Sequence, residues 1–303
     1  MILNKPILQE QTGNPFGLRN AAAYTAWRER KLAAYPQSAK ELLVEIDNPH
    51  ALSAAERNAI GEACSRANMA IYTINGDHRD DKSVVRDLGT QCGLHRLDAN
   101  LYADDDGISA LQVSAERRQH EYIPYSNKSI SWHTDGYYNT RDHRIRAMVL
   151  HCAQPAAQGG ENLLLDHEML YLLIRDENPL YIEALMQPTV MTIPANIENG
   201  VEIRPEQTGP VFSVDPETGH LHMRYTARTR SIAWLQDEIT QEAVRFLEKV
   251  LAADSPYIFR HRLTAGQGVI CNNVLHTRSA FENDASQQRL VYRARYYDRI
   301  RLP

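Results

Sequence analysis

The sequence has few cysteines, and their spacing forms no recognisable framework. Its four cysteines are far apart and include no CxxC pair. They are Cys64, Cys92, Cys152 and Cys271. This spacing argues against a disulfide framework and against a structural zinc site. We therefore expect reduced, mostly buried thiols in a cytoplasmic protein.

Long hydrophobic runs and a leader pattern are also missing. No apolar run approaches the ~20 residues that a membrane-spanning helix needs. The first residues contain no basic stretch followed by an apolar core, so they do not resemble a signal peptide. We expect no association with a membrane.

An excess of positive charge is absent as well. The 38 acidic residues outnumber the 33 lysines and arginines, which gives a net charge of −5 at pH 7. This balance does not favour nucleic acid as a partner, so we expect a small molecule instead. An acidic protein can still hold a locally basic pocket, and the C-terminal region predicts one.

No repeat, low-complexity segment or linker divides the 303 residues, so we expect a single domain. Residues 1–92 form a helix-rich N-terminal part, and residues 93–303 are mainly extended with a helical insertion. Helices are predicted over 21–35, 53–67, 82–92, 167–175 and 236–252. Strands are predicted over 69–74, 108–113, 130–135, 147–152, 191–193, 211–214, 221–225, 268–273 and 289–297. This order predicts an α+β protein built around a β-sandwich.

The most informative segment is Ser-Trp-His-Thr-Asp-Gly-Tyr-Tyr at residues 131–138. Side chains two residues apart in a strand share a face, so His133 and Asp135 could bind one metal ion together. His276, near the end of another apolar segment, is the best candidate for a third ligand. Two imidazoles and one carboxylate form the facial triad of non-heme Fe(II) oxygenases.

Arginines gather near the C-terminus. If residues 289–297 form a strand, Arg289, Arg293 and Arg295 lie on one face. A buried guanidinium without an anion is costly. The pattern therefore predicts either a wall that binds carboxylates or a solvated edge with surface salt bridges, and the metal motif favours the wall.

From about Gly93 to the C-terminus, the chain resembles the Fe(II)/2-oxoglutarate-dependent dioxygenases of the taurine dioxygenase (TauD/TfdA) superfamily. The metal triad of that family corresponds to His133, Asp135 and His276. Its double-stranded β-helix, or jelly roll, with flanking helices agrees with the strand-rich pattern. Two branches look most similar, namely γ-butyrobetaine hydroxylase and glutarate 2-hydroxylase.

The resemblance implies roles for residues around the cosubstrate. Arg289 matches the arginine that pairs with the far carboxylate of 2-oxoglutarate, and Arg293 matches one that meets the substrate anion or the cosubstrate. Asn162 stands where the family usually has a hydroxyl residue, and its amide can still donate a hydrogen bond. Asp135 argues against halogenation, because related halogenases have a small residue there.

The resemblance also implies a reaction. Fe(II), 2-oxoglutarate and O2 would be used to hydroxylate a C–H bond, with succinate and CO2 as coproducts. The expected substrate is a small anionic or zwitterionic metabolite, such as an amino acid, a dicarboxylate or a betaine. Family members are often dimers or tetramers, so a homo-oligomer is expected. Two alternatives stay open: a metal-dependent jelly-roll enzyme that does not use 2-oxoglutarate, and a non-catalytic ligand-binding jelly roll.

Two groups of residues are candidates for binding the substrate. Tyr137 and Tyr138 follow the metal motif, and they either cage a quaternary ammonium group or pack inside the sandwich. Arg224 precedes Arg228 and Arg230. This basic group either binds a substrate carboxylate or pairs with surface acids.

Overall fold

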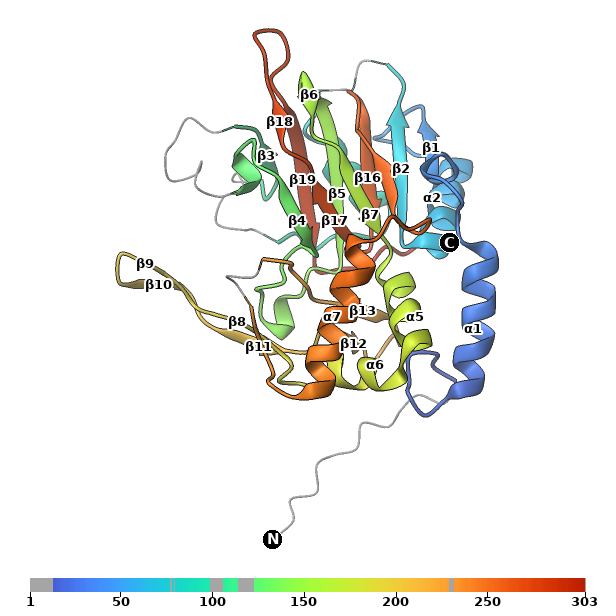
Figure 1. Cartoon of the computed structure of the whole chain (residues 1–303). Coiled ribbons are helices and arrows are strands. Elements are labelled where there is room, and N and C mark those ends of the chain that lie inside the picture. Colours follow the sequence, from blue (N-terminus) through green and yellow to red (C-terminus); the bar gives the residue numbers. More distant parts are fainter. Residues whose placement is uncertain are drawn as a thin grey trace.

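The computed structural model describes residues 13–76, 78, 80–98, 106–113, 123–228 and 232–302. Helices and short strands are mixed along these residues, and two of the sheets are larger than the others (Figure 1). The predicted helices and strands are all present, with ends that differ by at most two residues. The expected mixture of helix and strand is confirmed.

The six-stranded sheet combines strands from both ends of the chain. Its order is β1–β2–β16–β5–β19–β3; the β1–β2 pair is parallel and the other pairs are antiparallel. The strands are β1 (Leu43–Ile46), β2 (Met69–Ile74), β16 (Gln267–Cys271), β5 (Ala147–Gln154), β19 (Leu290–Tyr296) and β3 (Ser109–Leu111). The central strands β5 and β16 are almost fully buried, which explains their continuous apolar sequences. The helix-rich N-terminal part therefore also supplies one edge of this sheet.

The four-stranded sheet carries the histidines of the metal motif. Its order is β15–β7–β17–β4, with antiparallel pairing throughout. The strands are β15 (Phe259–His261), β7 (Asn162–Leu165), β17 (Leu275–Arg278) and β4 (Ile130–His133). Arg293 of β19 lies 3.2 Å from Asp135, which follows β4. The two larger sheets therefore meet across the metal motif.

Helices cover the six-stranded sheet and fill one end of the molecule. Helices α2 and α3 pack on that sheet, whereas α5, α6 and α7 lie together below the sheets in Figure 1. The helices are α1 (Ala21–Ala34), α2 (Ala54–Ala67), α3 (Val84–Gln91), α5 (His167–Glu177), α6 (Pro179–Leu185) and α7 (Glu238–Ala252), with 3-10 turns at Ala39–Leu42, Ile123–Tyr125 and Arg141–His143. None of the helices in the described part of the chain is long and apolar enough to cross a membrane.

Local sequence signals explain how several helices begin and pack. The Ser53 hydroxyl accepts a hydrogen bond from the Glu56 N–H, and the Glu56 carboxylate accepts one from the Ser53 N–H. This capping box starts α2 as predicted. In α7 the apolar stripe is buried at Ala243, Leu247 and Leu251, so it packs in the core. All four cysteines are buried and free, as the sequence predicts.

A buried ionic cluster attaches α1 to α5. Lys31 Nζ lies 2.6 Å from Asp166 Oδ2 and 2.9 Å from Glu168 Oε2. The Lys31 side chain is only 4% exposed. Asp166 also caps α5, because its carboxylate accepts a hydrogen bond from the Glu168 N–H at 2.9 Å. Removal of one partner from such a buried cluster costs about 3–5 kcal/mol, so these contacts hold the N-terminal helix in place.

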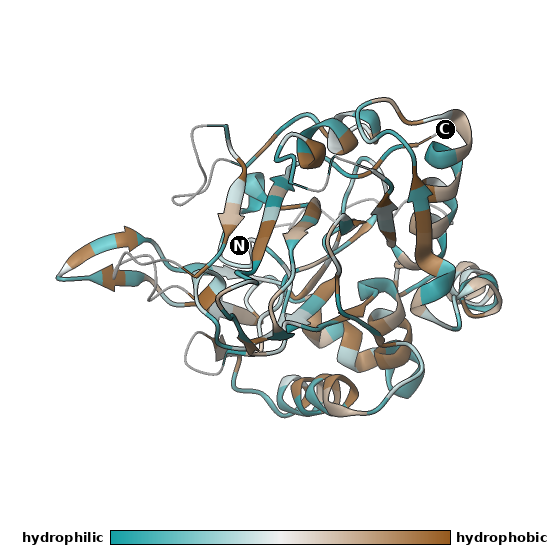
Figure 2. Ribbon diagram, turned by 90° about the horizontal axis from the view of Figure 1, so that it is seen from above, coloured by the Kyte–Doolittle hydropathy of each residue, from teal (hydrophilic) through white to brown (hydrophobic). Residues whose placement is uncertain are grey.

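The remaining strands form small sheets. These are β6 (Gln158–Gly159) with β18 (Phe281–Glu282), β12 (Phe212–Val214) with β13 (Leu221–Met223), β9 (Asn196–Glu198) with β10 (Val201–Arg204), and β8 (Met191–Ile193) with β11 (Gln207–Gly209) and β14 (Ala233–Trp234). The β9–β10 hairpin projects from the rest of the molecule (Figures 1 and 2). Asn199 and Gly200 form its turn with φ of 51° and 80°, as Asn-Gly hairpin turns require. Ile197 and Val201 on this hairpin are 62% and 61% exposed, which marks it as an apolar projection.

Candidate active site

His133 and His276 face each other on neighbouring strands. They form a directly opposed pair in the β4–β17 ladder, and their ring centroids lie 4.1 Å apart. Nδ1 of His133 lies 2.9 Å from the Ser131 carbonyl oxygen, and Nδ1 of His276 lies 3.0 Å from the Val274 carbonyl oxygen. A proton on each Nδ1 donates to its carbonyl and leaves Nε2 free to bind a metal ion.

Asp135 joins the two histidines from a turn. Strand β4 ends at His133, so the predicted strand over 130–135 was too long, and a shared strand face does not position this carboxylate. Asp135 Oδ1 lies 3.5 Å from His133 Nε2 and 4.0 Å from His276 Nε2. Gly136 allows the turn, since it has a φ of +65° and an added Cβ would lie 2.4 Å from Ile145 Cγ1. The three ligand atoms lie within 4.8 Å of one another, so they can share one ion.

Asn273 holds the Asp135 turn in place, and the sequence analysis missed it. Its Oδ1 accepts a hydrogen bond from the Asp135 N–H at 2.8 Å. Its Nδ2 donates to the carbonyls of Asp135 and Ile145 at 2.9 and 2.7 Å. Asn273 has a φ of +51°, a conformation that asparagine tolerates better than most residues. The only sequence signal for this role was an asparagine three residues before His276. Its partner, Asp135, is 138 residues away in the chain, so the contact could not be predicted.

The charges around the triad suit a divalent cation. Burial alone would raise the pKa of Asp135, but Arg293 and His133 hold it well below its usual range. Burial and the neighbouring His133 lower the pKa of His276 to about 3. One ionised carboxylate and a neutral imidazole with a free nitrogen are the protonation states in which these side chains bind metals.

Arg289 is a buried cation without an anion among the described residues. It is only 7% exposed, and its Nη1 has no hydrogen-bond partner. Burial lowers its pKa to about 10, and its guanidinium lies 5.1 Å from the centre of the Phe281 ring. It lines a pocket formed by Cys152, Pro155, Ala156, Gly159, Gly160, Asn162, Arg262, Leu263, Arg289 and Val291. Such an uncompensated guanidinium is favourable only when the pocket receives an anion.

The other residues predicted to hold the cosubstrate lie in the same region. Asn162 lines the Arg289 pocket, and its buried Oδ1 also has no hydrogen-bond partner. Leu164 of β7 pairs with His276 across the ladder, so their side chains lie on the same face of the sheet. Asn162 is two residues from Leu164 on β7 and shares that face. The Arg289 pocket therefore lies on the same side of the four-stranded sheet as the metal ligands.

Arg293 and Arg295 have different partners. Arg293 Nη1 lies 3.2 Å from Asp135 Oδ2 and 3.4 Å from Asp135 Oδ1. Arg295 pairs with Asp98 and donates to the Tyr138 hydroxyl at 3.1 Å. Arg293 and Arg295 therefore share a face of β19, but Arg289 precedes this strand and the ladder shifts register between Leu290 and Val291. Arg293 is the arginine that contacts Asp135.

The predicted substrate residues lie among basic side chains. The Tyr137 and Tyr138 rings meet edge to face, with centroids 5.0 Å apart. Arg204 lies over the Tyr138 ring at 5.6 Å, and Arg228 hydrogen-bonds Tyr137. Arg224 donates to the carbonyls of β8 and β11, at Met191, Gln207 and Gly209. Its role toward a substrate stays a prediction, and Arg230 lies outside the described residues.

Three side chains that could hold one metal ion lie on the same side of the sheet as a buried, unpaired arginine, an arrangement expected of a metal-dependent oxygenase. Residues 30–295 match the model of the Taurine catabolism dioxygenase TauD, TfdA family, and the chain belongs to that family. It is an Fe(II)- and 2-oxoglutarate-dependent dioxygenase that uses O2. The match begins at residue 30, so the predicted start near Gly93 was wrong. Strands β1 and β2 complete the main sheet, which explains why the family pattern includes them.

Individual proteins and solved structures are similar to this chain. A uridine-5'-phosphate dioxygenase from Streptomyces sp is 27% identical over 211 residues, covering 67% of this chain and 74% of that protein. One from Amycolatopsis sp is 30% identical over 172 residues, covering 54% of this chain and 60% of that protein. A solved asparagine oxygenase with Fe(II), 3-hydroxyasparagine and succinate has a TM-score of 0.59 at 18% identity, covering 95% and 87% of the two chains. These relatives do not belong to the γ-butyrobetaine or glutarate branches, so the comparisons do not support that finer placement.

Proposed function

We propose that the protein hydroxylates a C–H bond of a small anionic or zwitterionic metabolite, releasing succinate and CO2. In this proposal the two larger sheets form the double-stranded β-helix of the family within a single catalytic domain. Fe(II) is held by His133, Asp135 and His276. The far carboxylate of 2-oxoglutarate pairs with Arg289, and Asn162 donates a hydrogen bond to it.

One observation carries the proposal: the buried Arg289 guanidinium has no anionic partner among the described residues. A jelly-roll metalloenzyme without 2-oxoglutarate has no need of such a group. A non-catalytic ligand-binding jelly roll would differ in binding no iron at the triad. A carboxylate supplies both the charge and the paired acceptors that a guanidinium fork requires. The anion pocket and the metal ligands on one side of the sheet match the two ends of a 2-oxo dicarboxylate.

The protein residues have separate tasks in this reaction. When bound, Fe(II) with 2-oxoglutarate supplies the oxidising power, and the protein supplies geometry and charge. Arg293 Nη1 lies 3.2 Å from Asp135 Oδ2 and donates to Oδ1 at 3.4 Å, so it keeps this carboxylate ionised beside the histidine Nε2 atoms. The carbonyls of Ser131 and Val274 keep the histidine rings in the ligating tautomer. Arg289 orients the cosubstrate by binding the end that does not react.

The surroundings of Tyr137 and Tyr138 favour an anionic substrate over a betaine. A quaternary ammonium would need open aromatic faces. Instead, Arg204 covers the Tyr138 ring and Arg295 donates to its hydroxyl. Arg204 repels an ammonium group and attracts a carboxylate or a phosphate, whereas the charge of Arg295 is already paired with Asp98. The names of the relatives contain one nucleotide and one amino acid, so both classes belong in a substrate screen.

An anaerobic titration tests the cosubstrate directly. Fe(II) and 2-oxoglutarate added to the purified protein should produce a weak metal-to-ligand charge-transfer band in the visible spectrum. The band should be lost in His133→Ala and kept in His95→Ala, which changes an exposed histidine outside the site. Absence of the band from the folded wild-type protein would rule out the proposal.

A coupled assay then identifies the substrate class. Succinate release should rise above the background when the correct substrate is present. The screen compares amino acids, dicarboxylates and nucleoside monophosphates with betaines. A response confined to betaines would contradict the argument from Arg204.

A further inference from the structure

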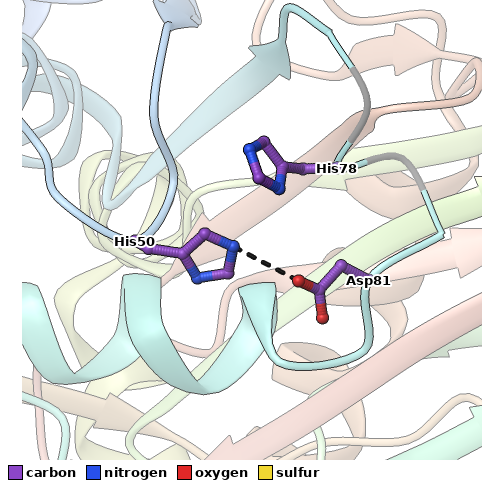
Figure 3. A group of neighbouring side chains, drawn as sticks. All are labelled: His50, His78 and Asp81. Carbon is purple, nitrogen blue, oxygen red and sulfur yellow. Dashed lines mark ion pairs between the residues drawn. The ribbon is translucent and has the colours of Figure 1, made fainter.

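A second group of metal-binding side chains lies away from the triad. His50, His78 and Asp81 each offer one ligand atom, and these atoms lie within 4.8 Å of one another (Figure 3). His50 comes from the loop after β1, and the other two come from the segment between β2 and α3. Ile46 pairs with Ile74 at the carboxyl ends of the parallel strands β1 and β2. The two segments that follow these strands therefore begin side by side. The sheet topology therefore brings this cluster together.

Neighbouring residues hold the His50 and Asp81 side chains through His50 Nδ1 and Asp81 Oδ1. The other nitrogen and the other oxygen are left free for a metal ion. His50 Nδ1 lies 2.6 Å from Asp87 Oδ2, which leaves His50 Nε2 facing the cluster. Asp81 Oδ1 accepts hydrogen bonds from the Ser83 N–H and hydroxyl at 2.8 and 2.7 Å. Its Oδ2 is left to point at His50 (Figure 3). A carboxylate behind a histidine is the usual support of a metal-bound imidazole.

The spacing of two of the three ligand atoms matches a tetrahedral ion. His50 Nε2 and Asp81 Oδ2 lie 3.2 Å apart. Two ligands at about 2.0 Å from a zinc ion in tetrahedral geometry are about 3.3 Å apart. The His78 ring lies beside His50, with ring centroids 4.9 Å apart. A modest shift of His78 would bring its nitrogen to the same ion, and water would fill the fourth position.

A simple ion pair explains only part of this arrangement. A protonated His50 would satisfy Asp81 and Asp87 without any metal. That explanation gives no reason for His78, which makes no ion pair within the described residues and lies against another imidazole. A second imidazole with a ligand atom within 4.8 Å of the other two is better explained by a cation among the three side chains.

We propose that His50, His78 and Asp81 form a second divalent-metal site of the Zn2+ type. Two nitrogens and one carboxylate oxygen are ligands that Zn2+ accepts, whereas Mg2+ and Ca2+ prefer oxygen alone. The ion ties the loop after β1 to the segment before α3 at one edge of the six-stranded sheet. The site needs no cysteine, so the cysteine spacing that argues against a zinc site does not bear on it.

Metal stoichiometry tests the proposal without relying on activity. The background is the His133→Ala/His276→Ala double variant, which removes two of the three triad ligands. After chelator treatment and dialysis, this protein should bind one equivalent of Zn2+, measured by elemental analysis. Adding His78→Ala should abolish that binding, whereas adding His95→Ala should leave one equivalent.

Two further measurements separate a metal site from a structural role of the same residues. Asp87→Asn on the double-variant background should weaken Zn2+ binding about 10- to 100-fold while all three ligands remain. Co2+ should give tetrahedral visible absorption that disappears with His78→Gln, a variant that keeps the side chain polar. Circular dichroism checks that each variant folds. Failure of the folded background protein to bind Zn2+, or unchanged binding after His78→Gln, would overturn the proposal.

Discussion

Arg293 and Asp135 form an ion pair across the two larger sheets, with Arg293 Nη1 3.2 Å from Asp135 Oδ2. Both side chains are largely buried, at 11% and 4% exposure. The guanidinium keeps a candidate metal ligand ionised in a buried site, and it contacts both oxygens of that carboxylate.

The first prediction concerns this pair. Arg293→Met should lower Fe(II) affinity about 10- to 100-fold, because the carboxylate loses the partner that orients it. The KM for 2-oxoglutarate, measured at saturating Fe(II), should change less. Isothermal titration under anaerobic conditions measures the first effect, and Arg293→Lys should recover part of the loss. Unchanged Fe(II) affinity in folded Arg293→Met would show that Arg293 serves another ligand.

The second prediction concerns Arg289. Arg289→Ala should raise the KM for 2-oxoglutarate by at least about 30-fold, since truncating one partner of a buried charge pair costs about 2–5 kcal/mol. Fe(II) binding without cosubstrate should stay nearly constant. Arg262 is a suitable control because it lines the same pocket but is exposed and donates to the carbonyls of Ala156 and Ala157. An equal loss of iron and cosubstrate binding in Arg289→Ala would contradict the assignment.

Local sequence signals were sufficient for most helices and for the long strands. The capping box at Ser53 and the apolar stripe of α7 depend on neighbours within a few residues, so they can be recognised directly. Strand β1 was not predicted, because four residues with two exposed positions resemble a loop until β2 pairs with them. The β9–β10 hairpin was missed for a similar reason, although Asn199-Gly200 marks its turn.

The side chains of the candidate metal site could be recognised by residue type, but their geometry could not. His133, Asp135 and His276 were identified together, yet the strand argument for Asp135 was wrong because β4 ends before it. The carboxylate is positioned by Asn273, by the Gly136 turn and by Arg293, which are long-range or conformational effects. Arg295 pairs with Asp98, which leaves Arg293 as the arginine beside Asp135. The alternation of side chains along a strand does not reveal that Asp98 is the partner of Arg295.

The third prediction tests the Asn273 clamp. Asn273→Ala should lower the free energy of unfolding by about 1–3 kcal/mol, since the Asp135 N–H loses its buried acceptor. It should also lower kcat, because the turn that carries the carboxylate becomes less ordered. Asn273→Gly is the matched variant, as it removes the amide but relieves the positive φ. Both variants should lose activity, and Asn273→Gly should be the more stable of the two in urea unfolding. Full activity in either variant would contradict the clamp.

The fourth prediction concerns acid stability and the cluster that holds α1. Burial opposes ionisation of Glu168, but Lys31, His167 and Arg299 lower its pKa from 4.5 to about 2. Because the folded pKa lies below the ordinary value, the charge stabilises the fold fully above about pH 4.5, and this stabilisation is lost as the pH falls toward about 2. Glu168→Gln should therefore be less stable than wild type at neutral pH, and the difference should shrink through that window. Urea unfolding across the pH range measures this, with Glu62→Gln as an exposed control in α2. Parallel stability curves for wild type and Glu168→Gln would show that this carboxylate is not coupled to folding through its charge.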